Sequence, residues 1–226
     1  MIEKYDAILL TAGKGERFGL PLNKIFYLIN NKAVFEYSLK VFLSDERCNK
    51  IVIVYNKNDL NILNEYLVKY NTNKIELCEG GALRQESVLN GLEVCDSEYV
   101  IVHDAARPNI SYDLVTNVLL GFSKSDSVSL GVKVTDTLKK VTEGLETIER
   151  DNLYYVQTPQ GSKREVLLEA LKKAKNVVVT DDLQAIENFT NVKPIIVSGS
   201  KSNIKITTIE DIEILQFYLE KKKCIE

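Results

Sequence analysis

Short β-branched runs alternate along the chain with longer stretches whose apolar residues recur at helical spacing. The near-continuous apolar run at 51–55 is typical of a strand that is buried on both faces. The predicted strands cover residues 7–10, 51–55, 75–78 and 99–103, and the predicted helices cover residues 33–43, 59–70, 87–94 and 112–122. This alternation predicts right-handed βαβ units. The fold class is therefore α/β, with a mostly parallel sheet and helices on both faces.

The alternation breaks between residues 132 and 152. Two polar, β-like runs, 135–141 and 145–150, flank a turn that contains Gly144, which predicts a protruding β-hairpin. A hairpin with so few core-facing residues is marginally stable alone, so it packs either on its own domain or on a partner subunit. The second reading makes it a dimerisation arm, over about 132–153, of a homodimer.

The remaining pattern predicts helices over 163–175 and 182–188, a strand over 194–197 and a final helix. Thr207 and Glu210 have the spacing of a capping box before that final helix. The chain has no internal repeat, low-complexity stretch or linker, so we expect one domain over residues 1–226.

Composition excludes several classes of protein. The 226 residues are 45% hydrophobic and carry a net charge of −3, which argues against disorder and against general binding of nucleic acid. The four cysteines are dispersed, without a C-x-x-C pair, so neither a zinc site nor a disulfide framework is expected. With no signal peptide and no apolar stretch long enough for a membrane span, we expect a cytoplasmic protein.

The loop after the first predicted strand is rich in glycine and in positive charge. Gly13 and Gly15 allow a ligand to approach the backbone closely, and their N–H groups can bind phosphate. A dinucleotide-binding fingerprint would need glycine where Phe18 stands, and the ending of a phosphate-binding P-loop is also missing. Three cations within or just after the loop favour a triphosphate: Lys14, Arg17 and Lys24.

Three later segments add candidate chemistry. The tandem Gly80-Gly81 can expose backbone groups to a flat base, while Ser87 either contacts that base or caps a helix. Asp104, at the end of an apolar strand, is a hard-oxygen ligand for phosphate-bound Mg²⁺. Lys205 is either a solvent-facing edge charge or a second electrostatic clamp on the triphosphate.

The residues beside Asp104 have less specific interpretations. Arg107 can pair with Asp104 or with a substrate oxygen. His103 is the only histidine, and a structural hydrogen-bonding role is favoured over a catalytic one.

Together these segments resemble the cytidylyltransferase family of nucleotidyltransferases, over nearly the whole chain. The matching motifs are the A-G-x-G-x-R loop at 12–17 with Lys24, Gly80-Gly81 with Arg84 and Ser87, His103-Asp104-Ala105-Ala106-Arg107-Pro108, Asp136-Thr137, Glu149-Arg150, Gln157-Thr158-Pro159-Gln160, Thr180-Asp181-Asp182 and Asn203-Ile204-Lys205. The resemblance implies a Rossmann-like fold, a homodimer, and transfer of a cytidylyl group from CTP, with Mg²⁺, to methylerythritol phosphate. Many relatives carry an acidic residue where Ala82 stands, so the chain departs from the family pattern at this position.

The resemblance also implies roles for individual residues. The catalytic cations would be Arg17, Lys24 and Lys205. The nucleotide would be bound by Thr11, Ala12, Gly13, Lys14, Gly15, Gly80, Gly81, Ser87, Asp104 and Ala105. The acceptor phosphate would be surrounded by Asp104, Arg107, Thr137, Arg150, Thr180 and Lys205, with Thr137 and Arg150 reaching across from the partner's arm. Asp104 is the candidate metal ligand.

Three other functions compete with this one. A ribitol 5-phosphate cytidylyltransferase shares the scaffold, and only the small Ala106 favours methylerythritol phosphate as the acceptor. A nicotinamide oxidoreductase is disfavoured by Phe18 and by the lack of a proton relay around the single histidine. A non-catalytic nucleotide-binding protein would not need Lys24, Asp104 and Lys205 together.

Overall fold

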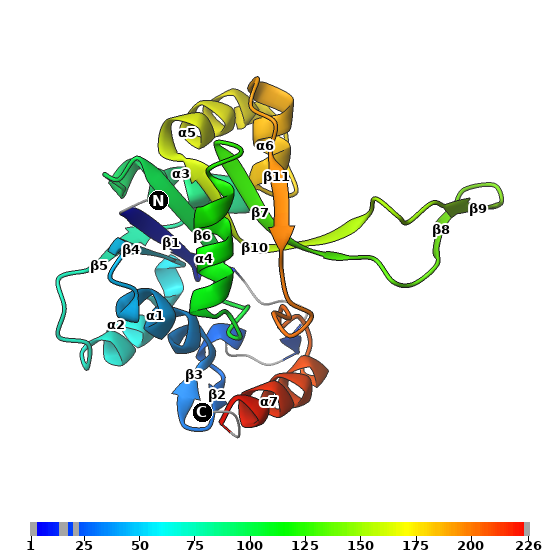
Figure 1. Ribbon diagram of the computed structural model, residues 1–226. Coiled ribbons are helices and arrows are strands. Elements are labelled where there is room, and N and C mark those ends of the chain that lie inside the picture. Colours follow the sequence, from blue (N-terminus) through cyan, green and yellow to red (C-terminus); the bar gives the residue numbers. More distant parts are fainter. Residues whose placement is uncertain (1–3, 14–17, 20–22, 224–226) are drawn as a thin grey trace.

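A seven-stranded sheet forms the centre of the computed structural model, which describes residues 4–13, 18–19 and 23–223 (Figure 1). The strand order within that part of the chain is β11-β7-β10-β6-β1-β4-β5. The strands are β1 (Tyr5–Leu10), β4 (Cys48–Tyr55), β5 (Ile75–Glu79), β6 (Tyr99–Asp104), β7 (Ser127–Lys133), β10 (Tyr154–Lys163) and β11 (Ile195–Ser198). All neighbouring pairs are parallel except those of β10, which runs antiparallel to β6 and β7. The predicted α/β class and mostly parallel sheet are confirmed.

The hydrophobic pattern of the sequence does not predict two strands of this sheet, β7 and β10. In β7, the apolar residues are interrupted by Ser127, Ser129 and Gly131, and β10 contains Pro159 within the polar 157–160 motif. Ser129 is nevertheless fully buried, because its hydroxyl donates to the carbonyl oxygen of Gln157 at 3.0 Å. Buried hydroxyls and amides that find partners across the sheet leave no hydrophobic signal in the sequence.

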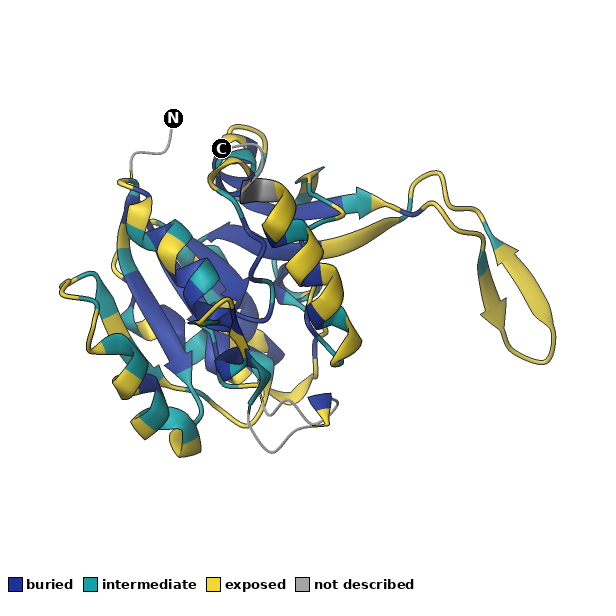
Figure 2. Ribbon diagram, turned by 90° about the horizontal axis from the view of Figure 1, so that it is seen from below, coloured by how far each residue is buried: buried dark blue, intermediate teal, exposed yellow. Residues whose placement is uncertain are grey.

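Helices cover both faces of the sheet. One face carries α1 (Val34–Ser44), α2 (Leu60–Leu67) and α4 (Tyr112–Gly121), and the other carries α3 (Arg84–Val94), α5 (Arg164–Lys173) and α6 (Asp182–Phe189). Alternate residues of β1 enter the two cores, with Leu9 in the first cluster and Ile8 in the second. Figure 2 shows the resulting buried sheet between partly exposed helices. Burial on both faces explains the continuous apolar strands of the sequence.

The last helix, α7 (Glu210–Lys223), packs on a separate, smaller core. Its Ile212, Leu215 and Leu219 lie with Phe18 and Ile206 in this cluster. The predicted capping box is wrong in its acidic partner. Asp211, not Glu210, accepts hydrogen bonds from the backbone N–H groups of Thr207 and Thr208, at 2.7 and 2.9 Å.

Two further expectations are corrected in detail. Helix α3 begins at Arg84 rather than at residue 87, since Glu86 accepts from the backbone N–H of Leu83, the residue before the helix, at 3.1 Å. The segment 203–207 forms no strand; within it Lys205 is exposed, while Asn203 and Ile206 are buried.

A small hairpin projects from the sheet. Strands β8 (Leu138–Val141) and β9 (Leu145–Ile148) pair antiparallel with each other and extend far from the body of the chain (Figure 1). Nearly all of this segment is exposed, including Val141 and Leu145, each 73% exposed (Figure 2).

Among the described residues, no helix has both the length and the apolar character needed to span a bilayer.

Candidate active site

A pocket of about 660 Å³ opens where β1 and β6 end and where the loop after β5 begins. This is the carboxyl edge of the parallel strands, where open α/β sheets bind their ligands. The lining residues are Leu10, Thr11, Ala12, Gly13, Lys24, Ile25, Asn56, Gly81, Ala82, Leu83, Arg84, Ser87, Asp104, Ala106 and Lys205. Eight predicted site residues therefore meet in one place: Thr11, Ala12, Gly13, Lys24, Gly81, Ser87, Asp104 and Lys205.

Asp104 stands at the centre of the charges in this pocket. Its Oδ2 accepts a hydrogen bond from Lys205 Nζ at 2.5 Å, and its Oδ1 lies 3.4 Å from Arg84 Nε. Arg84 also forms a two-pronged pair with Asp182, at 2.9 and 3.0 Å. Lys205 and Arg84 are far apart in the sequence, and the fold brings both to one carboxylate.

The pKa values follow from burial and from these cations. Burial raises the pKa of Asp104, but the charges of Arg84 and Lys205 outweigh burial and hold it well below its usual range. Asp182 responds in the opposite direction, because burial raises its pKa more than Arg84 lowers it. Asp104 therefore stays ionised and keeps the two cations at the floor of the pocket.

The glycine loop after β5 is shaped by close contacts. A Cβ at Gly81 would lie 2.3 Å from the Cβ of Glu86, and one at Gly80 would lie 2.8 Å from the Cβ of Ala12. Ser87 holds the loop, since its Oγ accepts from Gly81 N–H at 3.1 Å and donates to the Leu83 carbonyl at 3.2 Å. Of the two sequence interpretations of Ser87, helix capping is wrong: Leu83 stands at the N-cap of α3.

His103 is fully buried behind the pocket and bonds to three neighbours. Its Nε2 lies 3.1 Å from the Arg107 carbonyl oxygen and 3.2 Å from Ser38 Oγ, and its Nδ1 lies 3.2 Å from Thr158 Oγ1. These partners assign the proton to Nε2, which donates to the carbonyl. Burial lowers the pKa of His103 to about 4, so the ring is neutral. This is the structural role that the sequence favoured.

Arg107 does not line the pocket. It donates from Nη1 to the carbonyl oxygen of Asn203 at 2.8 Å, and so ties the loop after β6 to the segment before Lys205. Ala105 is buried, with its N–H bonded to the Leu10 carbonyl at 3.0 Å.

The other predicted residues are not gathered in this pocket. Lys14, Gly15 and Arg17 lie outside the described residues. Thr180 is exposed just before α6, bonded through its hydroxyl to Gln184 Oε1 at 3.1 Å. Thr137 and Arg150 are exposed at the base of the β8–β9 hairpin, where Arg150 donates to the Thr135 carbonyl.

Arg84 is the functional residue to which the sequence analysis assigned no role. The only available signal was its place in the Gly80-to-Ser87 motif, because its partners Asp104 and Asp182 are 20 and 98 residues away. Only the fold shows that it links the two carboxylates.

The donor set in the pocket fits a magnesium ion that arrives with phosphates. Asp104 is the one carboxylate among the described lining residues, and no cluster of three or more metal-ligating side chains occurs elsewhere in the described chain. Protein sites that use one or two carboxylates plus substrate phosphates are typical of Mg²⁺.

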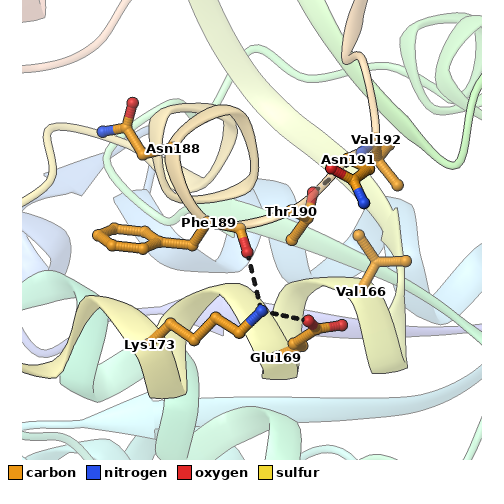
Figure 3. A pocket seen from close by; sticks show the side chains of 8 residues that line it. All are labelled: Val166, Glu169, Lys173, Asn188, Phe189, Thr190, Asn191 and Val192. Atoms are coloured by element: carbon orange, nitrogen blue, oxygen red, sulfur yellow. Dashed lines mark hydrogen bonds and ion pairs between the residues drawn. The ribbon is translucent and has the colours of Figure 1, made fainter.

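A second hollow, of about 560 Å³, lies between α5 and the end of α6 (Figure 3). Its charged side chains, Lys173 and Glu169, pair with each other at 2.6 Å, and Lys173 also donates to the Phe189 carbonyl at 3.2 Å. Both charges of this hollow are thus neutralised by each other, and none of the predicted site residues lines it, so the Asp104 pocket is the better candidate.

Comparison with known proteins gives one consistent result. Residues 6–221 match the family described as 2-C-methyl-D-erythritol 4-phosphate cytidylyltransferase. A protein of that name from Bacillus mycoides is 39% identical over 225 residues, covering 97% of this chain and 99% of the relative. The crystal structure of 4-diphosphocytidyl-2C-methyl-D-erythritol synthase from Anaerococcus prevotii has a TM-score of 0.85 and 32% identity, covering 96% of this chain and 99% of that one. A Francisella tularensis 2-C-methyl-D-erythritol 4-phosphate cytidylyltransferase has a TM-score of 0.80 and 34% identity, over 95% and 99% of the two chains.

The buried histidine makes a prediction about pH. Its pKa is about 4 in the folded chain, against about 6.5 when unfolded, so the unfolded state binds the proton first as pH falls. Neutral His103 contributes its full stabilisation above about pH 6.5 and loses it as the pH falls toward 4. Between pH 7 and pH 5 the free energy of unfolding should fall by about 2 kcal/mol on this account. Urea unfolding at both pH values should show that the free energy of unfolding falls less in His103→Gln than in the wild type. Equal losses in the two proteins would contradict the assignment.

Proposed function

The chain belongs to the 2-C-methyl-D-erythritol 4-phosphate cytidylyltransferase family, and on that premise we propose that the Asp104 pocket is its active site. The family reaction joins CTP and 2-C-methyl-D-erythritol 4-phosphate, giving 4-diphosphocytidyl-2-C-methyl-D-erythritol and pyrophosphate, a step of non-mevalonate isoprenoid biosynthesis. The chain is thus a CTP-dependent nucleotidyltransferase. The observation that carries the site assignment is that Lys205 and Arg84 bind Asp104 in a pocket that Lys24 also lines, at the carboxyl edge of the sheet.

The reaction needs no protein nucleophile. A phosphate oxygen of methylerythritol phosphate attacks the α-phosphorus of CTP. The bond between that phosphorus and the oxygen that bridges it to the β-phosphate breaks, and pyrophosphate leaves. Negative charge from two phosphorylated substrates must come together at one phosphorus, so catalysis depends on positioning and on charge neutralisation. The pocket supplies cations, and the histidine buried behind it, His103, is neutral and bonded to neighbouring groups.

The pocket residues divide between the parts of CTP. Ala12, Gly13 and the Gly80-Gly81 loop, held by Ser87, would contact cytosine or ribose with backbone groups. Lys24 and Lys205 would neutralise the reacting phosphates, with Lys14 and Arg17 as further phosphate ligands. Lys205 reaches the site from the segment before α7, near the end of the chain, whereas Lys24 begins a short 3-10 helix, Lys24–Phe26, near its start.

Mg²⁺ would enter with CTP and be held by Asp104. When bound, it screens the charge of the phosphate oxygens. Asp104 suits this role because its pKa keeps it ionised at every physiological pH.

The acceptor should be methylerythritol phosphate rather than ribitol phosphate. Pyrophosphate release from CTP with each sugar-alcohol phosphate, measured side by side, should show much higher kcat/KM for methylerythritol phosphate. Comparable kcat/KM values, or a preference for ribitol 5-phosphate, would contradict the acceptor assignment, and calorimetry showing no CTP binding with Mg²⁺ would contradict the site.

The two pocket lysines should be needed for turnover and not for folding. Removal of one preorganised charge donor typically costs about 3–4 kcal/mol, or roughly 10²–10³ in rate. Lys24→Ala and Lys205→Ala should each lower kcat by about that factor, while circular dichroism stays close to that of the wild type. The melting temperature of Lys205→Ala should fall, because Asp104 then keeps only Arg84 as a paired cation. Lys201→Ala is the matched control, because Lys201 is exposed and lies outside the pocket. A folded Lys24 or Lys205 variant with near-normal kcat would remove that lysine from the mechanism.

The β8–β9 hairpin would complete the site across a homodimer. Thr137 and Arg150 lie outside their own pocket, on a segment that extends away from the body and exposes Val141 and Leu145 (Figure 1). An exposed apolar pair on a projecting hairpin is explained if a second copy covers it. Arg150 and Thr137 of one subunit would then contact the acceptor bound to the other.

Mixed dimers test this arrangement. Subunits with Arg150→Ala and subunits with Lys24→Ala should each be inactive as homodimers. A random mixture should regain about a quarter of wild-type activity, because half of the dimers are mixed and each has one intact site. Mixed dimers, verified by mass spectrometry, that remain inactive would show that Arg150 acts within its own subunit or not at all.

A further inference from the structure

The motif Gln157-Thr158-Pro159-Gln160 has no role in the mechanism above, although it lies buried beside the site. Gln157, Thr158 and Gln160 are 8%, 5% and 3% exposed. The register of β10 against β7 shifts inside the motif: Gln157 lies opposite Leu130, and Gln160 lies opposite the next residue, Ser129. Such a bulge in a strand beside an active site redirects side chains away from regular pairing.

Gln157 holds the backbone of the segment that leads to Lys205. Its Nε2 donates to the carbonyl oxygens of Ser200 and Asn203, at 2.8 and 3.3 Å, and its Oε1 accepts from Ser200 N–H at 3.2 Å. The approach is close, because a Cβ at Gly199 would lie 2.5 Å from Gln157 Oε1. One side chain thus binds both ends of the turn at 200–203.

The segment has no secondary structure of its own, so it is held by separate contacts, among them Arg107 Nη1 to the Asn203 carbonyl and Ile206 N–H to the Ala106 carbonyl, both at 2.8 Å. Residues 203–207 form neither a helix nor a strand. Asn203 donates from Nδ2 to the Thr158 carbonyl at 2.8 Å, so a second contact ties the segment to the same strand. Lys205 follows two residues later and meets Asp104 at 2.5 Å.

Gln160 makes a different set of contacts. Its Nε2 donates to Asp181 Oδ2 at 3.1 Å, and its Oε1 accepts from Asp182 N–H at 3.2 Å. It therefore holds the beginning of α6 and has no bond to the segment that carries Lys205.

We propose that Gln157 is a positioning residue, which fixes the 200–203 turn so that Lys205 is held against Asp104 in the geometry that the reaction needs. The proposal rests on the proposed role of Lys205 and extends it to a side chain that does not touch the substrates. Misplacement of a catalytic group by about 1 Å can lower a rate by roughly 10²-fold. Gln157→Ala should therefore lower kcat by between about 10- and 100-fold.

A double-mutant cycle with Lys205→Ala tests whether Gln157 acts through Lys205. If it does, Gln157→Ala should cause little further loss of kcat once Lys205 is absent, since coupled residues are not additive. Gln160→Ala is the matched control, with the same substitution in the same motif on an equally buried glutamine. Its effect should multiply with that of Lys205→Ala.

The possible results distinguish a failure of the Gln157 proposal from a failure of the proposed role of Lys205. Three results would each overturn the positioning role. The first is a near-normal kcat in Gln157→Ala. The second is a double variant in which the losses from Gln157→Ala and Lys205→Ala multiply in full, and the third is a Gln160→Ala variant that is as strongly coupled to Lys205→Ala as Gln157→Ala is. Near-normal kcat in Lys205→Ala would overturn the proposed function of Lys205 itself. If Gln157→Ala does not fold, Gln157→Glu replaces it, because the carboxylate keeps the side-chain size and loses both donors to Ser200 and Asn203. It should show the same lack of additivity with Lys205→Ala.

Discussion

The pairing of Asp104 with two cations at the carboxyl edge of the sheet is the interaction on which the site depends. Burial of a carboxylate costs free energy unless opposite charge compensates it. Here Lys205 and Arg84 supply that charge from distant parts of the chain. The same cluster therefore stabilises the folded pocket, and under the proposed function it would also meet the phosphate groups of the substrates.

Each member of this cluster is held by a different element of the fold. Asp104 ends β6, and its N–H donates to Thr158 on the neighbouring strand at 3.1 Å. Arg84 opens α3 and pairs with Asp182 at the start of α6. Lys205 lies on an irregular segment that is held by side-chain contacts to β10, by Arg107, and by the bond from Ile206 N–H to the Ala106 carbonyl at 2.8 Å. Strand and helix ends thus hold Asp104 and Arg84, whereas the irregular segment that carries Lys205 depends on side-chain hydrogen bonds.

The antiparallel strand β10 has a larger part in this arrangement than its sequence indicates. It separates β6 from β7, and its 157–160 motif contacts three site segments: the turn before Lys205, the end of β6 and the start of α6. A chemistry that needs no protein nucleophile instead needs several groups in fixed relation to one another. A buried polar strand suits that need, because its hydrogen bonds have direction while hydrophobic packing has little.

The sequence alone determined the parallel βαβ framework and the segments that carry the chemistry. Runs such as 51–55 reveal strands buried on both faces, and the glycines and cations after the first strand, with Asp104 at the end of another, indicate a phosphate site. These features are local, so spacing and residue type suffice to read them. The tertiary structure alone decided that β7 and β10 complete the sheet, that Arg84 joins Asp104 to Asp182, and that Ser87 and His103 serve neighbouring backbone. Each of these depends on hydrogen bonds and ion pairs that are mostly between residues remote in the chain, and no local pattern of apolar and polar positions encodes such partners.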